Sequence, residues 1–319
     1  MNSIGFGTWA WGNQIIWGYN PEKDDVLLEA TFKEAIDGGI NLIDTADSYG
    51  TGSLKGRSEE LLGKFLKRLS HSKLKKITVA TKLAPFPWRI GRKGFNNAFL
   101  LSKKRLQGKL DRVQIHWSTY RYAPWQETQL IDGLADLIEE GSVKEIGVSN
   151  MGPNRIRYFH QRLMEREIKL KSAQIQLSLL SPKPKEYQSL KDTCDELNIE
   201  VLAYSPLAFG VLTMKPEEEK LPSQFIRRKI MIRLLNSSKE LRRMLNNIAS
   251  YRRVSRTQVA LNWVRSNGAI PIPGIRNPNQ AREVKLAKNW DLSKKETDDL
   301  NILSLNCLER MPNNPFQSP

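Results

Sequence analysis

Short apolar segments alternate with longer amphipathic segments along the whole chain. The short segments are rich in β-branched residues and predict eight strands, at residues 4–8, 40–43, 77–81, 113–116, 145–148, 173–176, 201–204 and 269–272. The segments between them carry apolar residues at helical spacing, and each is long enough for a crossover helix. The pattern therefore predicts an α/β fold, a single (β/α)8 TIM barrel over residues 1–310, in preference to two domains.

The connection between the seventh and eighth strands is about twice as long as the others. It predicts an insertion over residues 206–238, on the face of the barrel where active sites of this fold lie. We expect this insertion to act as a mobile clamp over a polyanionic ligand, with a passive surface loop as the alternative. Residues 311–319 are rich in Pro and Asn and predict a loose C-terminal tail.

The composition is that of a globular protein with an unusually high positive charge. The 319 residues include 50 Lys and Arg against 34 Asp and Glu, a formal net charge of +16. Much of the excess lies between Lys220 and Arg256, where acidic residues are rare. A solvated helix face is the main interpretation, and nucleic-acid binding is the weaker one because no aromatic residues interleave the basic ones. We expect no nucleic-acid partner.

Membrane and metal functions find no support in the sequence. No stretch approaches the roughly 20 consecutive apolar residues of a membrane span, and the first residues lack the pattern of a signal peptide. Cys194 and Cys307 are too few and too isolated for a disulfide framework or a metal site. We expect a cytoplasmic protein without a membrane partner.

Four residues with proton chemistry fall at the ends of three successive predicted strands. Asp44 closes the second strand and Tyr49 follows it by five residues, while Lys82 and His116 close the third and fourth strands. Because the ends of neighbouring parallel strands lie on one rim of a barrel, we expect the four side chains to converge there. Each alone is more often structural, as a helix cap, a packed ring or a solvated charge.

Together the four residues suit the protonation of a carbonyl oxygen. A tyrosine has a pKa of about 10, and we expect the Lys82 ammonium to lower the pKa of Tyr49. Asp44 can hold Lys82 in place, and His116 can hydrogen-bond the oxygen that Tyr49 protonates. This set suits a reaction in which another group delivers hydride.

The sequence resembles the aldo-keto reductase family over essentially its whole length. The resemblance rests on the motifs GFGTW (5–9), NLIDTADSYG (41–50), ATK (80–82), QIHW (114–117), GVSN (147–150), QIQ (174–176), AYSPL (203–207) and IPIPG (270–274). The family's catalytic tetrad falls on the same Asp44, Tyr49, Lys82 and His116. The loop at residues 83–89 resembles the plant and cyanobacterial branch, some members of which reduce pyridoxal.

The resemblance also implies NADPH as the cofactor and a set of residues that bind it. Ser149, Asn150 and Gln174 would hold the nicotinamide amide, and Tyr204 would lie under its ring. Ser205, Leu207 and Gly210 would line the pyrophosphate. Gly274 would also belong to the cofactor site. Arg276, two residues later, would meet the 2′-phosphate, where an arginine fork suits a phosphate, and Gln280 and Glu283 would lie near the adenine.

The resemblance implies an NADPH-dependent reductase of a small carbonyl substrate. The alternative is a nucleotide-bound, non-catalytic regulatory subunit like the potassium-channel β-subunits, which resemble the same family. Five tryptophans near strand ends either form an aromatic substrate wall or pack the loops: Trp11, Trp17, Trp88, Trp117 and Trp125. The sequence predicts neither the physiological substrate nor the oligomeric state.

Overall fold

Eight parallel strands lie side by side in chain order in a computed structural model that describes residues 3–181, 184–215 and 221–318. The strands are β1 (Gly5–Gly7), β2 (Leu42–Asp44), β3 (Thr78–Leu83), β4 (Arg112–Ile115), β5 (Glu145–Ser149), β6 (Leu170–Gln176), β7 (Glu200–Tyr204) and β8 (Ile270–Pro271). The backbone N–H of Gly7 donates to the Pro273 carbonyl at 2.9 Å, which joins β1 to the segment after β8. The predicted (β/α)8 barrel is confirmed.

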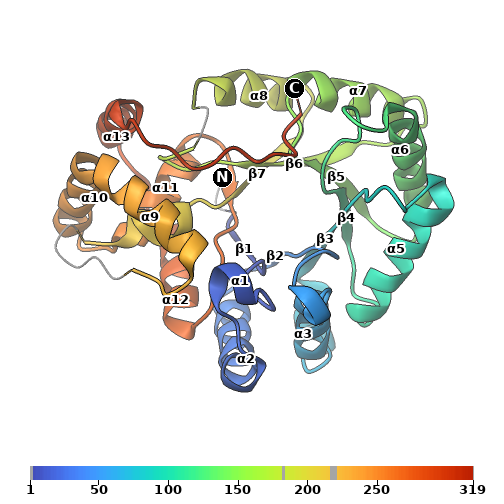
Figure 1. Cartoon of the computed structure of the whole chain (residues 1–319), viewed down its shortest axis with the longest axis horizontal. Coiled ribbons are helices and arrows are strands. Elements are labelled where there is room, and N and C mark those ends of the chain that lie inside the picture. Colours follow the sequence, from blue (N-terminus) through green and yellow to red (C-terminus); the bar gives the residue numbers. More distant parts are fainter. Residues whose placement is uncertain (1–2, 182–183, 216–220, 319) are drawn as a thin grey trace.

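Helices surround the strands, as Figure 1 shows. They are α1 (Gln14–Trp17), α2 (Pro21–Asp37), α3 (Arg57–Leu66), α4 (His71–Lys75), α5 (Gly91–Arg105), α6 (Pro124–Glu139), α7 (Pro153–Met164), α8 (Pro184–Glu196), α9 (Phe225–Ser237), α10 (Lys239–Arg252), α11 (Arg256–Ser266), α12 (Pro278–Leu286) and α13 (Lys294–Asn306). Short 3-10 turns are η1 (Gly52–Leu54), η2 (Ala208–Thr213) and η3 (Ala287–Asn289).

Local sequence fixes where several helices begin. The Asn20 side chain accepts a hydrogen bond from the backbone of Glu22, and Pro21 occupies the first helical position of α2. Ser293 and Glu296 form a reciprocal capping box at the start of α13. These caps satisfy backbone donors that the helices leave unpaired, so each preceding loop has a fixed end.

The register of the sheet brings the predicted site residues to one rim. Asp44 pairs with Gly7 and Ala80, Lys82 pairs with Gln114, and Ser149 pairs with Gln174. All of these positions lie at or near the carboxyl ends of their strands. The side chains that carry the predicted chemistry therefore meet at the mouth of the barrel.

The long connection after β7 lies where the sequence predicts the insertion. Within residues 206–238 the chain forms η2 and α9, while residues 216–220 lie outside the described part. The predicted loop is thus partly helical, because Met231, Leu234 and Leu235 on α9 are buried. Its action as a clamp stays a prediction.

The basic segment is solvated only in part. Its exposed members include Arg228, Lys229, Arg233, Arg243 and Arg253. Arg252 pairs with Glu296 at 2.7 Å, and Arg233 pairs with Glu309. Arg242 is buried and donates to backbone carbonyls, among them that of Leu235 at 3.3 Å. Arg242 is therefore used inside the fold, and Arg252 and Arg233 are held by acids distant in sequence.

The C-terminal residues are packed onto the barrel, which corrects the predicted loose tail. Figure 1 shows this segment running from α13 past β7 and β6 towards α7 and α8. The Met311 N–H donates to the Leu180 carbonyl at 2.9 Å, and the Ser318 N–H donates to the Asn150 carbonyl at 3.1 Å. Met311 and Ser318 are buried. Pro319, the last residue of the predicted tail, lies outside the described part.

Two further observations concern the apolar helices and the two cysteines. Among the helices that the structure describes, none has the length and apolar character needed to cross a membrane. Cys194 and Cys307 are both free and buried, as expected.

Candidate active site

The four predicted catalytic residues lie together at the barrel mouth. The Lys82 ammonium donates to an Asp44 carboxylate oxygen at 2.5 Å and to the Thr45 carbonyl at 2.8 Å. It lies 4.9 Å from the centre of the Tyr49 ring, and the ring centres of Tyr49 and His116 are 5.9 Å apart. The arrangement places a phenol between a cation and an imidazole.

The ion pair under Tyr49 is fully buried. The side chains of Lys82 and Asp44 are 1% and 3% exposed. Burial lowers the pKa of Lys82, and the Asp44 carboxylate works against that shift. Removing both charges from water is costly, so the pair depends on its hydrogen bonds.

The pKa of Tyr49 moves in the direction opposite to the expected one. Burial is the largest cause of the rise, and the carboxylates of Asp44 and Asp47 add to it. Lys82 is adjacent, but its charge is balanced by Asp44 at 2.5 Å. Tyr49 therefore keeps its proton well above neutral pH, which leaves it in the form that can donate.

Two glutamine amides hold Asp44 on the side opposite Lys82. Gln174 and Gln114 both donate to the Asp44 oxygen that Lys82 does not contact, at 2.7 and 3.1 Å. Sequence reasoning missed Gln114, although it lies two residues before His116 and so on the same face of its strand. Asp44 thus accepts three charge-assisted hydrogen bonds.

The imidazole of His116 is uncharged in this site. Burial and the nearby Lys82 charge lower the pKa of His116 well below its ordinary value. Its Nδ1 atom lies 3.3 Å from the hydroxyl oxygen of Ser48, a residue to which the sequence assigned no role. At neutral pH the ring therefore carries one N–H only.

A buried carboxylate and a glycine constrain the loop that carries Tyr49. Asp47 is buried, accepts from the Ala84 backbone at 3.2 Å and pairs with Arg89. Gly50 follows Tyr49 with φ of 112°, and a Cβ there would lie 1.8 Å from the Leu54 carbonyl oxygen. Only glycine fits that turn, so the backbone on both sides of Tyr49 is constrained.

The residues expected at the nicotinamide gather beside His116. Asn150 donates to the His116 carbonyl at 3.0 Å and to the Ser149 hydroxyl at 3.1 Å. The Tyr204 hydroxyl donates to the Asn150 amide oxygen at 2.8 Å. These side chains and Gln174 belong to the ends of β5, β6 and β7, so the structure brings them together next to the tetrad.

The C-terminal segment reaches this same group. The Asn314 amide lies 2.9 Å from both the Asn150 amide oxygen and the Tyr204 hydroxyl. The ring of Phe316 stacks on Trp117 with centres 4.2 Å apart. Sequence reasoning missed both contacts, because neither residue has a signal outside the folded structure.

The predicted pyrophosphate residues lie on an irregular turn covered by a cation. Ser205 and Gly210 have positive φ angles of 52° and 95°, and Leu207 lies between them. The Arg227 guanidinium donates to the Phe209 carbonyl at 3.0 Å and lies 4.2 Å from the centre of the Trp17 ring. Because of the positive φ angles at Phe209 and Gly210, the peptide groups of η2 do not follow the regular hydrogen-bond pattern of a helix.

The predicted 2′-phosphate and adenine residues follow β8. The backbone N–H of Arg276 donates to the Gln280 side-chain oxygen at 2.7 Å, and the Arg276 guanidinium lies 3.8 Å from the Asp24 carboxylate. Gly274 precedes them and is exposed. Glu283 is engaged elsewhere, since it accepts from Ser255 and from Gln258.

Arg227 and Arg276 make this end of the site suitable for an anion. Burial, and then the charge of Arg276, lower the pKa of Arg227 to about 10. The buried Nε atom of Arg227 has no hydrogen-bond partner among the described residues. Two neighbouring cations and an unpaired donor on Arg227 fit the phosphates of a dinucleotide.

The five tryptophans divide between the site and the rest of the fold. Trp117 is buried, with its ring centre 5.1 Å from that of His116, and it contacts Phe86, which stacks on the exposed Trp88. Trp17 lies under Arg227. Trp11 is fully buried in the core and Trp125 is exposed on α6. Only Trp117 and its neighbours thus border the tetrad.

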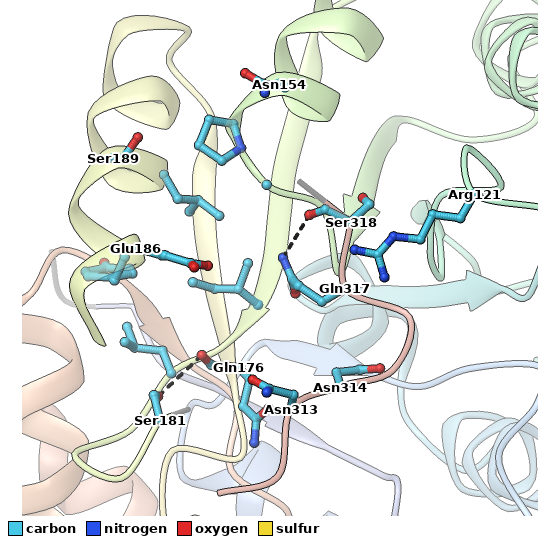
Figure 2. A pocket seen from close by; sticks show the side chains of 16 residues that line it. Arg121, Asn154, Gln176, Ser181, Glu186, Ser189, Asn313, Asn314, Gln317 and Ser318 are labelled. Carbon is cyan, nitrogen blue, oxygen red and sulfur yellow. Dashed lines mark hydrogen bonds between the residues drawn. The ribbon is translucent and has the colours of Figure 1, made fainter. Parts of the chain in front are cut away.

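A cavity of about 430 Å³ lies on the other side of the C-terminal segment. Figure 2 shows Arg121, Glu186, Gln176 and Gln317 among the side chains that line it. Among the described residues, none of the predicted catalytic or cofactor residues lines this cavity. Asn314 lies between it and the tetrad.

Comparison with known proteins places the chain among reductases. Residues 3–304 match the model of the aldo/keto reductase family. The chain is 44% identical to pyridoxal reductase, chloroplastic, of Arabidopsis thaliana, over 100% of this chain and 87% of that protein. That similarity agrees with the predicted plant and cyanobacterial branch.

Solved structures share the fold. The glycerol dehydrogenase AKR11B4 from Gluconobacter oxydans has a TM-score of 0.73 and 25% identity, covering 98% of this chain and 94% of that one. An aldo-keto reductase from Klebsiella pneumoniae, in complex with NADPH, has a TM-score of 0.71 and 24% identity, covering 99% and 93%.

Proposed function

Because the chain belongs to the aldo-keto reductase family, we propose that it uses NADPH to reduce an aldehyde or ketone to an alcohol, with Tyr49 as the proton donor. The family uses NADP(H), in agreement with the predicted cofactor. The observation that carries the proposal is the position of the Tyr49 ring, 4.9 Å from the Lys82 ammonium and next to His116.

The reaction needs a hydride at carbon and a proton at oxygen. Bound NADPH supplies the hydride. As the C–H bond forms, the C=O π electrons move onto oxygen, and the phenol of Tyr49 gives its proton to that oxygen. An alkoxide is a much stronger base than a phenolate, so the raised pKa of Tyr49 does not prevent the transfer. Tyr49 then recovers a proton from solvent.

His116 and the buried ion pair support this transfer. The neutral imidazole of His116 can donate to the substrate oxygen and orient it towards Tyr49. Lys82 stabilises the phenolate that is left behind, and Asp44 keeps Lys82 charged in spite of its burial. Each residue of the tetrad thus has one role in moving or balancing a single proton.

The remaining predicted residues would hold the cofactor. Ser149, Asn150 and Gln174 would bind the nicotinamide amide over Tyr204, where Gln174 keeps its amide oxygen free to accept because its N–H donates to Asp44. Arg227 would meet the pyrophosphate together with Ser205, Leu207 and Gly210. Arg276 would meet the 2′-phosphate, with Gly274 preceding it in the cofactor site, and Gln280 and Glu283 would lie near the adenine.

Arg276→Ala is expected to weaken NADPH binding far more than NADH binding. The loss should be roughly 1.5 to 3 kcal/mol for NADPH, because one charge-assisted contact to a phosphate disappears. Fluorescence titration with both nucleotides measures it. Arg282→Ala is the matched control, since Arg282 lies on the following helix, is exposed and pairs with Glu34. An equal loss for NADPH and NADH would contradict the contact.

We propose pyridoxal, a planar heteroaromatic aldehyde, as a substrate. The proposal rests on the similarity to the plant pyridoxal reductase and on the ring of Trp117 beside His116, which the rings of Phe86 and Phe316 contact. Contact with these rings is expected to raise kcat/KM about 3- to 10-fold over an aliphatic aldehyde of similar size.

A panel of aldehydes followed by NADPH absorbance tests both levels of the proposal. If the protein reduces aliphatic aldehydes but not pyridoxal, the proposal of pyridoxal as a substrate is wrong, while the proposed reductase activity stands. Tight NADPH binding without turnover of any carbonyl would contradict the reductase and favour a regulatory nucleotide-bound protein.

The proposed location is the cytoplasm, because both thiols are free and buried.

A further inference from the structure

The environment of the His116 ring contains one contact that the proposed reaction does not use. Nδ1 of His116 lies 3.3 Å from the Ser48 hydroxyl oxygen, and no other side chain in the described part of the protein is hydrogen-bonded to this ring. Ser48 comes immediately before Tyr49 and is half-buried. It therefore links the proton donor's loop to the imidazole.

The position of Ser48 is built into the backbone. The Asp47 N–H donates to the Lys82 carbonyl at 3.0 Å, and the Tyr49 N–H donates to the Ala46 carbonyl at 3.2 Å. Asp47 is buried and paired with Arg89. Since both neighbours of Ser48 are held, its backbone has a fixed place from which the hydroxyl reaches the ring of His116.

The contact allows two tautomers of His116, because a serine hydroxyl can donate to Nδ1 or accept from Nδ1–H. A neutral imidazole has one N–H, on Nδ1 or on Nε2, and the partner of one nitrogen fixes the state of the other. If Nδ1 carried the proton, Nε2 would present a lone pair to the lone pairs of a substrate carbonyl. If the Ser48 hydroxyl donates to Nδ1, Nε2–H is left to donate to that carbonyl.

We infer that Ser48 is a positioning residue that donates to Nδ1 of His116 and so keeps the proton on Nε2, facing the substrate oxygen. The inference rests on the proposed function, because it assigns the purpose of the tautomer to carbonyl binding. In the described part of the chain the Ser48 hydroxyl has no side-chain partner besides His116, which leaves its proton free for this bond.

Nitrogen-15 NMR of the histidine rings tests the tautomer without substrate or cofactor. The chain has only 3 histidines, so a His116→Gln variant assigns the His116 signals. We expect an Nε2–H tautomer in the parent protein and in Ser48→Thr, and a mixture of tautomers in Ser48→Ala. His160 serves as an internal control, since its Nδ1 is buried with no hydrogen-bond partner among the described residues.

Kinetics then test the consequence. Ser48→Ala is expected to lower kcat about 3- to 10-fold, as for the loss of one neutral hydrogen bond, while Ser48→Thr stays near the parent. NADPH affinity, followed by fluorescence, should not change in either variant. An unchanged affinity also shows that the barrel mouth is folded.

The outcomes separate this inference from the proposed function. A parent protein with the proton on Nδ1, or a Ser48→Ala variant with an unaltered tautomer, would overturn the role of Ser48. Unaltered kcat in Ser48→Ala despite a changed tautomer would overturn it too. Full turnover by His116→Gln would instead overturn the role of His116 in the proposed reaction, whatever the spectra of the parent show.

Discussion

Tyr49→Phe is expected to lower kcat by about 10² to 10⁴, the usual contribution of a general acid, and to leave NADPH binding nearly intact. The change removes one hydroxyl and little volume. Among the described residues, the Tyr49 hydroxyl makes no hydrogen bond to another side chain, so its removal should not destabilise the fold. The ring keeps its place over the Lys82 ammonium. Steady-state reduction of an aldehyde and fluorescence titration with NADPH measure the two quantities.

The matched control is Tyr251→Phe, because Tyr251 is 85% exposed on α10, away from the strand ends that carry the tetrad. It should leave both kcat and NADPH affinity unchanged. If Tyr49→Phe retains activity within tenfold of the parent, another group donates the proton and the assignment of Tyr49 is wrong.

The barrel and the meeting of the tetrad follow from sequence because both depend on strand ends. Parallel strands covered on both sides appear as short apolar runs, and the predicted second run at 40–43 overlaps the observed Leu42–Asp44. Once the strands are parallel, their last residues share a rim without any knowledge of helix packing. This is why Asp44, Lys82 and His116 could be placed together in advance.

Contacts between segments distant in sequence could not be predicted in this way. Arg252 and Glu296 are 44 positions apart, and a charge count over one segment misses such pairs. The C-terminal segment has the composition of a loose tail, and only the folded barrel supplies the Asn150 and Tyr204 groups that Asn314 contacts. The tail's packing is a tertiary effect.

The direction of the Tyr49 pKa shift was also beyond the sequence. The Lys82 charge is evident there, but the burial that is the main cause of the rise in the Tyr49 pKa depends on the closed barrel. Gln114 and Ser48 were overlooked for a related reason. Neither titrates, so neither stands out in a sequence until the atoms it touches, on Asp44 and His116, are known.

Lys82→Met is expected to remove most reductase activity and to lower the free energy of unfolding by about 3 to 5 kcal/mol, the cost of leaving one member of a buried ion pair unpaired. The change keeps most of the side-chain volume but leaves the Asp44 carboxylate, 3% exposed, with only its two glutamine donors. Urea unfolding measures the stability, and aldehyde reduction measures the activity.

The surface pair of Lys73 and Asp37 provides the control, since its atoms are also 2.5 Å apart but its side chains are 48% and 43% exposed. Lys73→Met should cost no more than about 1 kcal/mol, because water replaces the lost partner. The double variant Lys82→Met with Asp44→Asn should be less destabilised than the sum of the two single changes, because no charge remains buried. A Lys82→Met cost equal to that of Lys73→Met would mean that the Lys82 and Asp44 charges are not paired in the folded protein, and Lys82 could then not be the cation that balances the Tyr49 phenolate.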